Sequence, residues 1–420
     1  MNYFGRVVAY PRDARLFLLS SILIGFVGSI QGLQFNLYLR ALGYGQDFMG
    51  ILASIPAFAT MALALPFGLV AGKLGYRRAI LIGMILQAGG LLALCLLPDR
   101  LPLAGARILA GVGATLAGVV GAPFLAAAVG DRDRAHLFGF QAGASILSGM
   151  AGSALGGILP GLFAQAFDLP SEGVLAYRAA LLCTFALYLV AMVPISRITG
   201  SGRWERPRLG DVLARRSLVL RLVTIQTTIG LGAGLVIPFA NIFFRLKFSA
   251  SDPALGTLFA INALLMGLGS FAAPALAARI GRGRTVVLSQ GLSLPFLLLW
   301  GFGPTLTWAA MGYLVRTPLM NLAGPVFSLL VMELFPPGMR SGMNGILMVA
   351  WNAGWALGSL ASGYLQVALG FSYLFPCTAV LYAAAVYLNW RAFRHLGVDA
   401  PSEVRKPALS VPAARSWWQK

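Results

Sequence analysis

The sequence is poor in charged side chains: Asp, Glu, Lys and Arg make up 11% of its 420 residues, against 58% hydrophobic residues. Soluble domains carry about 25% charged residues, so this composition excludes a water-soluble surface and indicates a protein that lies in a bilayer. Cysteine occurs only three times, and Cys95, Cys183 and Cys377 all fall within apolar runs. That pattern supplies neither a disulfide framework nor metal-ligand spacing, so we expect no metal and no cofactor.

The sequence is rich in apolar runs of about 20 residues, the length that a membrane-spanning helix needs. None of these runs shows the period-2 alternation of barrel strands. Twelve of them are found, near residues 16–39, 48–71, 77–97, 102–129, 137–164, 174–195, 218–243, 253–278, 285–303, 306–333, 341–369 and 372–393. We therefore predict an all-α polytopic membrane protein with twelve transmembrane helices.

The 32 Lys and Arg residues divide unevenly between the two sides of such a bundle. With the N-terminus inside, 25 of them lie in cytoplasmic segments, five in outer loops, and Arg107 and Arg316 within spans. Short basic loops stay in the cytoplasm, which predicts a protein of the cytoplasmic (inner) membrane with both termini cytoplasmic. The net charge of +19 is spread over loops that face anionic lipid, so it does not indicate nucleic-acid binding.

Scarce residues repeat at an offset of about half the chain. Gly25, Asn36, Arg40 and Asp47 recur 205 residues later as Gly230, Asn241, Arg245 and Asp252. Asn, Arg and Asp are uncommon in so apolar a chain, so these matches indicate an internal duplication of the kind found in secondary transporters. We predict six-helix bundles at residues 1–196 and 218–396, a cytoplasmic linker at 197–217 and a disordered cytoplasmic tail at 397–420.

A basic loop with glycines follows the second span and recurs after the eighth. The first copy has Gly68, Lys73, Gly75, Arg77 and Arg78, and the second has Arg279, Gly281 and Arg284. This loop resembles the signature cytoplasmic loop of the major facilitator superfamily: Gly, three residues, Asp, a basic residue, any residue, Gly and two basic residues. The resemblance implies a gating loop that latches the two bundles together in one transport state. The family's Asp position is Gly72 in the first copy and Ala278 in the second, which departs from the usual charge-relay latch.

Two arginines lie within spans. Arg107, followed by Gly111 and Gly113, resembles the family's second motif, an intramembrane arginine with a stripe of small residues. Arg316 falls about one helical turn deeper when the two halves are superposed. An arginine in mid-membrane costs about 2.5–3.5 kcal/mol, and no acid lies within a span to neutralise it. We expect each to face carbonyl groups, polar side chains, cavity water or an anionic substrate, with a structural role as the alternative.

Further polar and aromatic side chains in mid-span are expected near the central cavity that the resemblance implies. They are Gln31, Gln34, Gln226, Asn262, Tyr313, Asn321, Asn344, Trp351, Asn352 and Trp355. Trp351 and Trp355 are four residues apart and share one helix face. Such an aromatic wall favours stacking against an amphipathic solute, and packing between helices is the alternative.

The repeated pairs Arg40 with Asp47 and Arg245 with Asp252 flank two outer loops. Because seven residues across a short loop bring the two side chains together, each pair can close a local ion pair. We interpret them as structural corner pairs, with an outer gate as the alternative.

The resemblance covers nearly the whole chain and implies a secondary-active or facilitative transporter that moves a small organic solute by alternating access. The predicted core has no carboxylate or histidine, which favours a facilitator. Glu333, the deepest acid, is the alternative coupling site, and proton-coupled efflux of amphipathic drugs or lipids is the alternative function. A membrane-embedded enzyme or a channel is a remote alternative, because the acids and histidines form no cluster. The expected partners are the solute and the lipid bilayer, and the expected state is a monomer.

Overall fold

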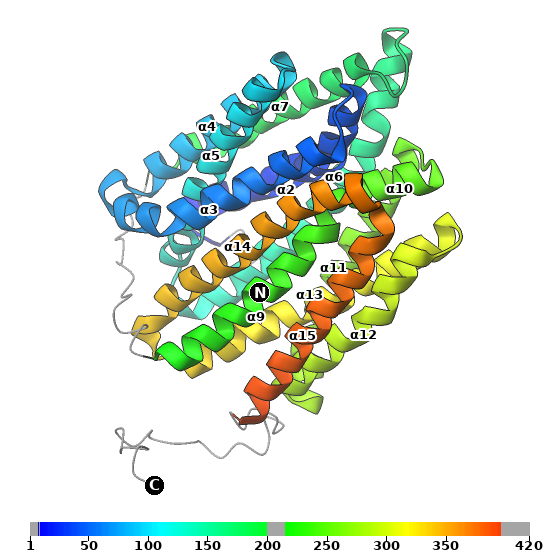
Figure 1. Cartoon of the computed structure of the whole chain (residues 1–420). Helices are drawn as coiled ribbons and strands as arrows, with labels where there is room; N and C mark the ends of the chain where they lie inside the picture. Colours follow the sequence, from blue (N-terminus) through cyan, green and yellow to red (C-terminus); the bar gives the residue numbers. More distant parts are fainter. Residues whose placement is uncertain (1–6, 8, 200–214, 396–420) are drawn as a thin grey trace, which may run out of the picture.

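The computed structural model describes residue 7 and residues 9–199 and 215–395, and every regular element within these ranges is helical. The first half consists of α2 (Arg12–Ala41), α3 (Gln46–Leu74), α4 (Tyr76–Leu96), α5 (Arg100–Ala127), α6 (Asp131–Ala166) and α7 (Val174–Ser196). The second half consists of α9 (Arg216–Val236), η1 (Ile237–Phe239), α10 (Ala240–Phe248), α11 (Asp252–Ile280), α12 (Arg282–Phe302), α13 (Leu306–Leu334), α14 (Pro337–Leu369), η2 (Phe371–Tyr373) and α15 (Leu374–His395). Figure 1 shows the halves as two groups of long helices, blue to teal and green to red.

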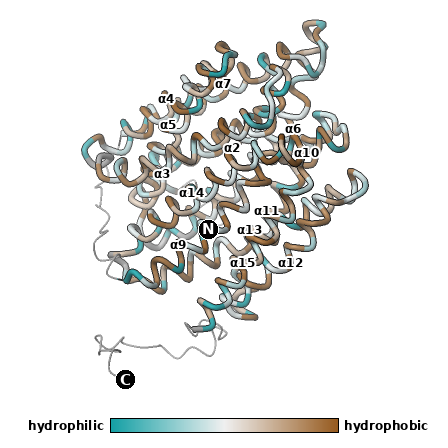
Figure 2. The backbone as a smooth tube through the Cα atoms, viewed as in Figure 1, coloured by the Kyte–Doolittle hydropathy of each residue, from teal (hydrophilic) through white to brown (hydrophobic). Residues whose placement is uncertain are grey.

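Eleven of these helical segments are long and apolar enough to cross a membrane, among the described residues. The twelfth long helix, α14, has the length but not the hydropathy, because asparagines, glycines and serines dilute its apolar residues. Figure 2 shows brown, hydrophobic stretches along the helices and teal, hydrophilic residues near many of their ends. The prediction of an all-α fold with twelve long helices is therefore confirmed.

The seventh predicted span, 218–243, is not one continuous helix. It consists of α9 and α10 with the 3-10 turn η1 between them, and Pro238 lies in that turn. Proline has no N–H to donate and its ring clashes with the carbonyl group four residues earlier, so an α-helix breaks there. The break leaves the Pro238 carbonyl oxygen free to accept a hydrogen bond from outside the helix.

Two close glycine contacts connect the halves. A Cβ atom on Gly50 of α3 would lie 2.8 Å from the Cα atom of Gly363 on α14, and one on Gly256 of α11 would lie 2.7 Å from that of Gly157 on α6. Small residues let helix backbones approach this closely within a membrane. Gly256 lies 206 positions after Gly50, and Gly363 lies 206 positions after Gly157. The internal repeat therefore extends to the packing between the bundles.

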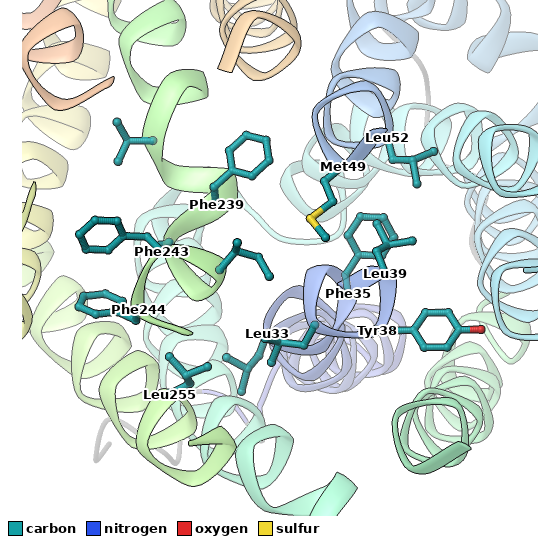
Figure 3. Close-up of a cluster of buried hydrophobic side chains, with 14 of the residues drawn as sticks. Leu33, Phe35, Tyr38, Leu39, Met49, Leu52, Phe239, Phe243, Phe244 and Leu255 are labelled. Atoms are coloured by element: carbon teal, nitrogen blue, oxygen red, sulfur yellow. The ribbon is translucent and has the colours of Figure 1, made fainter. Parts of the chain in front are cut away.

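The bundles share a core at one end and have separate cores at the other. We call the shared end the outer end, following the orientation that the charge bias predicts. There, Leu33 and Met49 of the first half lie in one hydrophobic cluster with Phe239 and Leu255 of the second (Figure 3). At the inner end, one cluster is built from residues of the first half alone and another from residues of the second. This conformation is therefore closed at the outer end.

The predicted division into bundles cannot be followed through the middle of the chain. Most of the expected linker 197–217 and the whole of the tail 397–420 lie outside the described residues. Those boundaries stay predictions.

Candidate functional site

Arg107 lies between three helices of the first bundle. Its side chain is half-buried, Nε donates to the Leu52 carbonyl oxygen at 3.1 Å, and its guanidinium carbon lies 4.4 Å from the centre of the Phe35 ring. The two terminal nitrogens donate to no residue within the described ranges. A guanidinium over an aromatic face is held by cation–π attraction, so Arg107 is oriented while its two terminal nitrogens stay available to a ligand.

Arg316 lies in a different environment, although both arginines lie within apolar spans of the sequence. Its side chain is 1% exposed, Nη2 donates to the Tyr382 hydroxyl at 2.6 Å, and the guanidinium also lies 5.2 Å from the Tyr382 ring centre. Nε is buried and has no hydrogen-bond partner in the described part of the chain. In this conformation Arg316 is thus enclosed in the second bundle. Arg107 thus contacts a backbone carbonyl group, whereas Arg316 contacts a tyrosine hydroxyl.

The remaining cavity candidates divide into two groups. Five are buried or bonded to nearby backbone: Gln34 donates to the Gly156 carbonyl oxygen, Asn321 to Thr317 and Asn352 to Met348, while Asn262 and Tyr313 are buried. Gln31 and Gln226 are half-buried, Asn344 is exposed, and none of the three has a hydrogen-bond partner among the described residues. Trp351 and Trp355 are half-buried and stack on each other, with ring centroids 4.9 Å apart.

Open space borders α2 on the side of Phe35. Gly28 and Gly32 precede Phe35 by seven and three residues, which places all three on one face of the helix. A Cβ atom added to either glycine would meet nothing within 4 Å. Gly28 and Gly32, on the helix face that also carries Phe35, are therefore not covered by any other part of the described structure.

At the outer end, the two repeated asparagines form a reciprocal contact between the bundles. Asn36 Nδ2 donates to the Pro238 carbonyl oxygen at 2.6 Å and to Asn241 Oδ1 at 3.0 Å. Asn241 Nδ2 donates to the Leu33 carbonyl oxygen at 2.8 Å. Leu33 and Pro238 are themselves 205 positions apart, so each asparagine bonds the backbone three residues before the other. The duplicated residues thus meet on the axis that relates the two halves.

A second cross-bundle network surrounds Arg245. This side chain forms ion pairs with Asp252 of its own bundle and with Glu172, which precedes α7. The Tyr177 hydroxyl, on α7, donates to both carboxylate oxygens of Asp252 at 2.9 and 3.0 Å, and Asp252 is only 8% exposed. The predicted pair Arg245–Asp252 therefore forms. Its contacts with Glu172 and Tyr177 of the first bundle also hold the two bundles together at the outer end.

The other predicted corner pair does not form: Arg40 and Asp47, both described residues, are not ion-paired. Arg40 is exposed at the end of α2, and the residue 205 positions after Glu172 is Cys377, which carries no carboxylate. Sequence reasoning also missed Glu172 and Tyr177. Tyr177 does recur 205 residues later as Tyr382, the partner of Arg316, a match that would have drawn attention to both tyrosines.

Comparison with known proteins identifies the family. A family model described as Major Facilitator Superfamily matches residues 17–220 and 222–417. The chain belongs to the major facilitator superfamily.

Several relatives show how far the likeness extends. A bacterial homologue of the human lysosomal transporter Spinster, solved in an inward-facing and unoccupied conformation, aligns with a TM-score of 0.75 at 14% identity, over 97% of this chain and 100% of that one. The nucleoside transporter NupG aligns with a TM-score of 0.72 at 13% identity, over 91% and 100%. An uncharacterized 38 kDa protein of Thermoproteus tenax is 27% identical over 349 residues, which is 77% of this chain and 86% of that protein.

Membership of this superfamily makes the chain a multi-pass membrane transporter that moves solutes by alternating access, and not an enzyme. The predictions of fold, family and transport are confirmed.

The two glycine loops have the same backbone form in both halves. Gly75 and Gly281 have φ angles of +77° and +92°, a region that only glycine adopts without strain. Lys73, Arg78 and Arg284 are exposed, and Arg77 donates to the Ser196 carbonyl oxygen at 2.6 Å. The other predicted loop residues, Gly68, Arg279 and Gly281, lie within or next to the ends of α3 and α11.

Glu333, the alternative coupling site, lies at the inner end of α13. It forms an ion pair with Arg282, and its side chain is 38% exposed. The sequence alternative required burial in the core, and the structure does not provide it. Among the described residues, the buried carboxylate is instead Asp252, at the outer end.

Proposed function

We propose that this transporter moves a small organic solute with a negative or strongly dipolar group, and that Arg107 holds that group. The observation that carries the proposal is the half-buried guanidinium of Arg107, fixed through Nε and Phe35, with its terminal nitrogens unbonded within the described residues. Paired N–H groups of an arginine match a carboxylate or phosphate well. The open space beside Gly28 and Gly32 supports a site at this depth.

The first test replaces Arg107 by glutamine. Loss of a hydrogen bond to a charged group costs about 1.5–3 kcal/mol, so binding of an anionic solute should weaken by roughly 10- to 150-fold. Binding is measured by calorimetry on purified protein with benzoate and indole-3-acetate as probes, and transport by counterflow of the same anions in proteoliposomes. Arg107→Lys should retain part of the affinity.

Arg221→Gln, which removes an exposed arginine at the inner end of α9, is the matched control and should change neither measurement. Unchanged anion affinity in a monodisperse Arg107→Gln protein would contradict the proposal.

We further propose that the chain acts as a monomeric facilitator in the cytoplasmic (inner) membrane. The charge bias of the loops supports the orientation. The exposed, ion-paired position of Glu333 supports transport without a proton relay through that residue. Asp252 is held by Arg245 and Tyr177 at the outer end, away from Arg107.

Orientation can be tested by cysteine labelling in a background without Cys95, Cys183 and Cys377. Ser171, in the exposed outer segment before α7, should react with a membrane-impermeant maleimide in intact cells when replaced by cysteine. Arg197→Cys, at the exposed inner end of α7, should react only after the cells are opened. The reverse pattern would place both termini outside.

A further inference from the structure

α14 has four distinct sides, and three of them are occupied or face lipid. Gly345 and Gly363 pack against α3, while Gly354 and Gly358 pack against α9. A third side carries exposed apolar residues, including Leu357 and Val367 at 52% and 62% exposure, as expected for contact with lipid.

The fourth side is the one opposite the lipid. It carries Asn344, Met348, Trp351 and Trp355, spaced four, three and four residues apart as one face of a helix requires. We call these four residues the inner stripe of α14. Since α3 and α9 flank this stripe and lipid lies behind it, the stripe faces the interior of the transporter.

The two tryptophans of the inner stripe form a preassembled aromatic surface. Their rings stack at 4.9 Å with an interplanar angle of 28°, and both side chains are only half-buried. Neither indole N–H donates a hydrogen bond to a described residue. Tryptophan offers a large flat face together with a polar edge, which suits a planar ring that carries acceptor groups.

Arg107 lies at nearly the same depth as this surface. The crossing of α3 and α14 gives a common reference, because a Cβ atom on Gly50 would lie 2.8 Å from the Ser359 carbonyl oxygen. Leu52, the acceptor for Arg107, lies about 3 Å inward of Gly50, and Trp355 lies about 6 Å inward of Ser359, at 1.5 Å per residue. Phe35 and Leu52 also belong to the hydrophobic cluster against which Trp355 packs.

We propose that the transported solute is a planar aromatic anion, whose ring stacks on Trp351 and Trp355 while its negative group binds Arg107. This inference rests on the proposed function and adds the ring to it. Aliphatic anions satisfy Arg107 but leave the tryptophan surface unmatched. Aromatic cations match the surface but find no buried carboxylate at this depth among the described residues.

The test compares anions of equal charge with and without an aromatic ring, by calorimetry on the purified full-length protein. The pairs are benzoate with cyclohexanecarboxylate, and indole-3-acetate with cyclohexylacetate. We expect each aromatic anion to bind roughly 3- to 10-fold more tightly than its saturated partner. Trp355→Leu should abolish this ratio and change the affinity for the saturated anions less than about two-fold, whereas Trp355→Phe should retain the ratio.

Trp308→Leu is the matched control, because Trp308 is an exposed tryptophan near the outer end of α13. It should leave the aromatic ratio unchanged. Each variant must elute as a monodisperse peak in size-exclusion chromatography.

Two outcomes would overturn the inference. The first is equal affinity for the aromatic and saturated anions. The second is a preference for the aromatic anion that survives in both Trp351→Leu and Trp355→Leu. Either result would show that the tryptophans do not contact the solute. If anion binding still depends on Arg107 in that case, the proposed function stands without the aromatic ring. If none of the four anions binds in an Arg107-dependent way, both proposals fail.

Discussion

Replacing Gly256 by alanine should abolish counterflow and lower the thermal stability of the protein. A Cβ atom at this position would lie 2.7 Å from the Cα atom of Gly157 and 2.9 Å from the Ser153 carbonyl oxygen, and both of these atoms belong to the backbone. Because no side chain can rotate away, α6 and α11 must separate. Overpacking of this kind costs about 1–3 kcal/mol, and here the strain falls on a contact between the two moving bundles.

The measurement is thermal unfolding followed by tryptophan fluorescence, together with counterflow in proteoliposomes. Gly50→Ala should have the same effect at the crossing of α3 and α14, since its Cβ atom would lie 2.8 Å from Gly363 Cα. Gly161→Ala is the control, because its Cβ atom would meet nothing within 4 Å. Alanine is favoured over glycine in a helix by about 1 kcal/mol, so this variant should be as stable as the original or more so.

If the Gly256→Ala and Gly161→Ala proteins transported equally well at equal stability, the two bundles would not be in contact at Gly256 and Gly157.

The twelve long helices could be predicted because the length of an apolar run is a local property. A run of about 20 apolar residues must hydrogen-bond its own backbone in lipid, and the helix is the form that does so within one segment. The internal repeat was likewise visible in Asn36 and Asn241. The break at Pro238 was predictable in principle, since proline inside a helical run signals one, but the apolar residues around it favoured a continuous span.

The roles of the repeated residues could not be predicted from the pattern. Asn36 and Asn241 bond each other's bundle, and that contact depends on how the halves face one another. Arg245 gains Glu172 as a partner from the opposite bundle, 73 residues earlier in the chain, while Arg40 forms no ion pair within the described ranges. The two copies of this sequence motif therefore make different contacts in the structure.

The candidate site was predicted as a set of residues but not as an arrangement. Arg107 and Arg316 are both arginines within apolar spans, and only the neighbouring helices decide that Arg316 is enclosed by Tyr382 whereas Arg107 is half-buried over Phe35. The pairing of Trp351 with Trp355 did follow from their spacing, because four residues along a helix bring side chains onto one face.

Linking the bundles covalently at the outer end should stop transport completely. Asn36 and Asn241 meet across the interface, with Asn36 Nδ2 and Asn241 Oδ1 3.0 Å apart, and their chain neighbours Phe35 and Ile242 belong to the shared hydrophobic cluster. Alternating access requires this end to open so that the site can reach the other side of the membrane. A bridge between residues 36 and 241 should hold the closed conformation described here.

The change is Asn36→Cys with Asn241→Cys in a background without the three native cysteines, bridged by a short bifunctional methanethiosulfonate reagent. Each single-cysteine variant, treated in the same way, controls for modification without bridging. If the double variant is inactive before bridging, Glu172→Cys with Arg245→Cys provides a second pair across the same interface.

The most direct test of this account is therefore counterflow by the bridged transporter before and after reduction of the bridge. We predict that bridging lowers counterflow more than ten-fold and that a reducing agent restores it, while both single-cysteine variants transport throughout. Undiminished counterflow by fully bridged protein would show that the outer end does not open during transport, and would contradict the account.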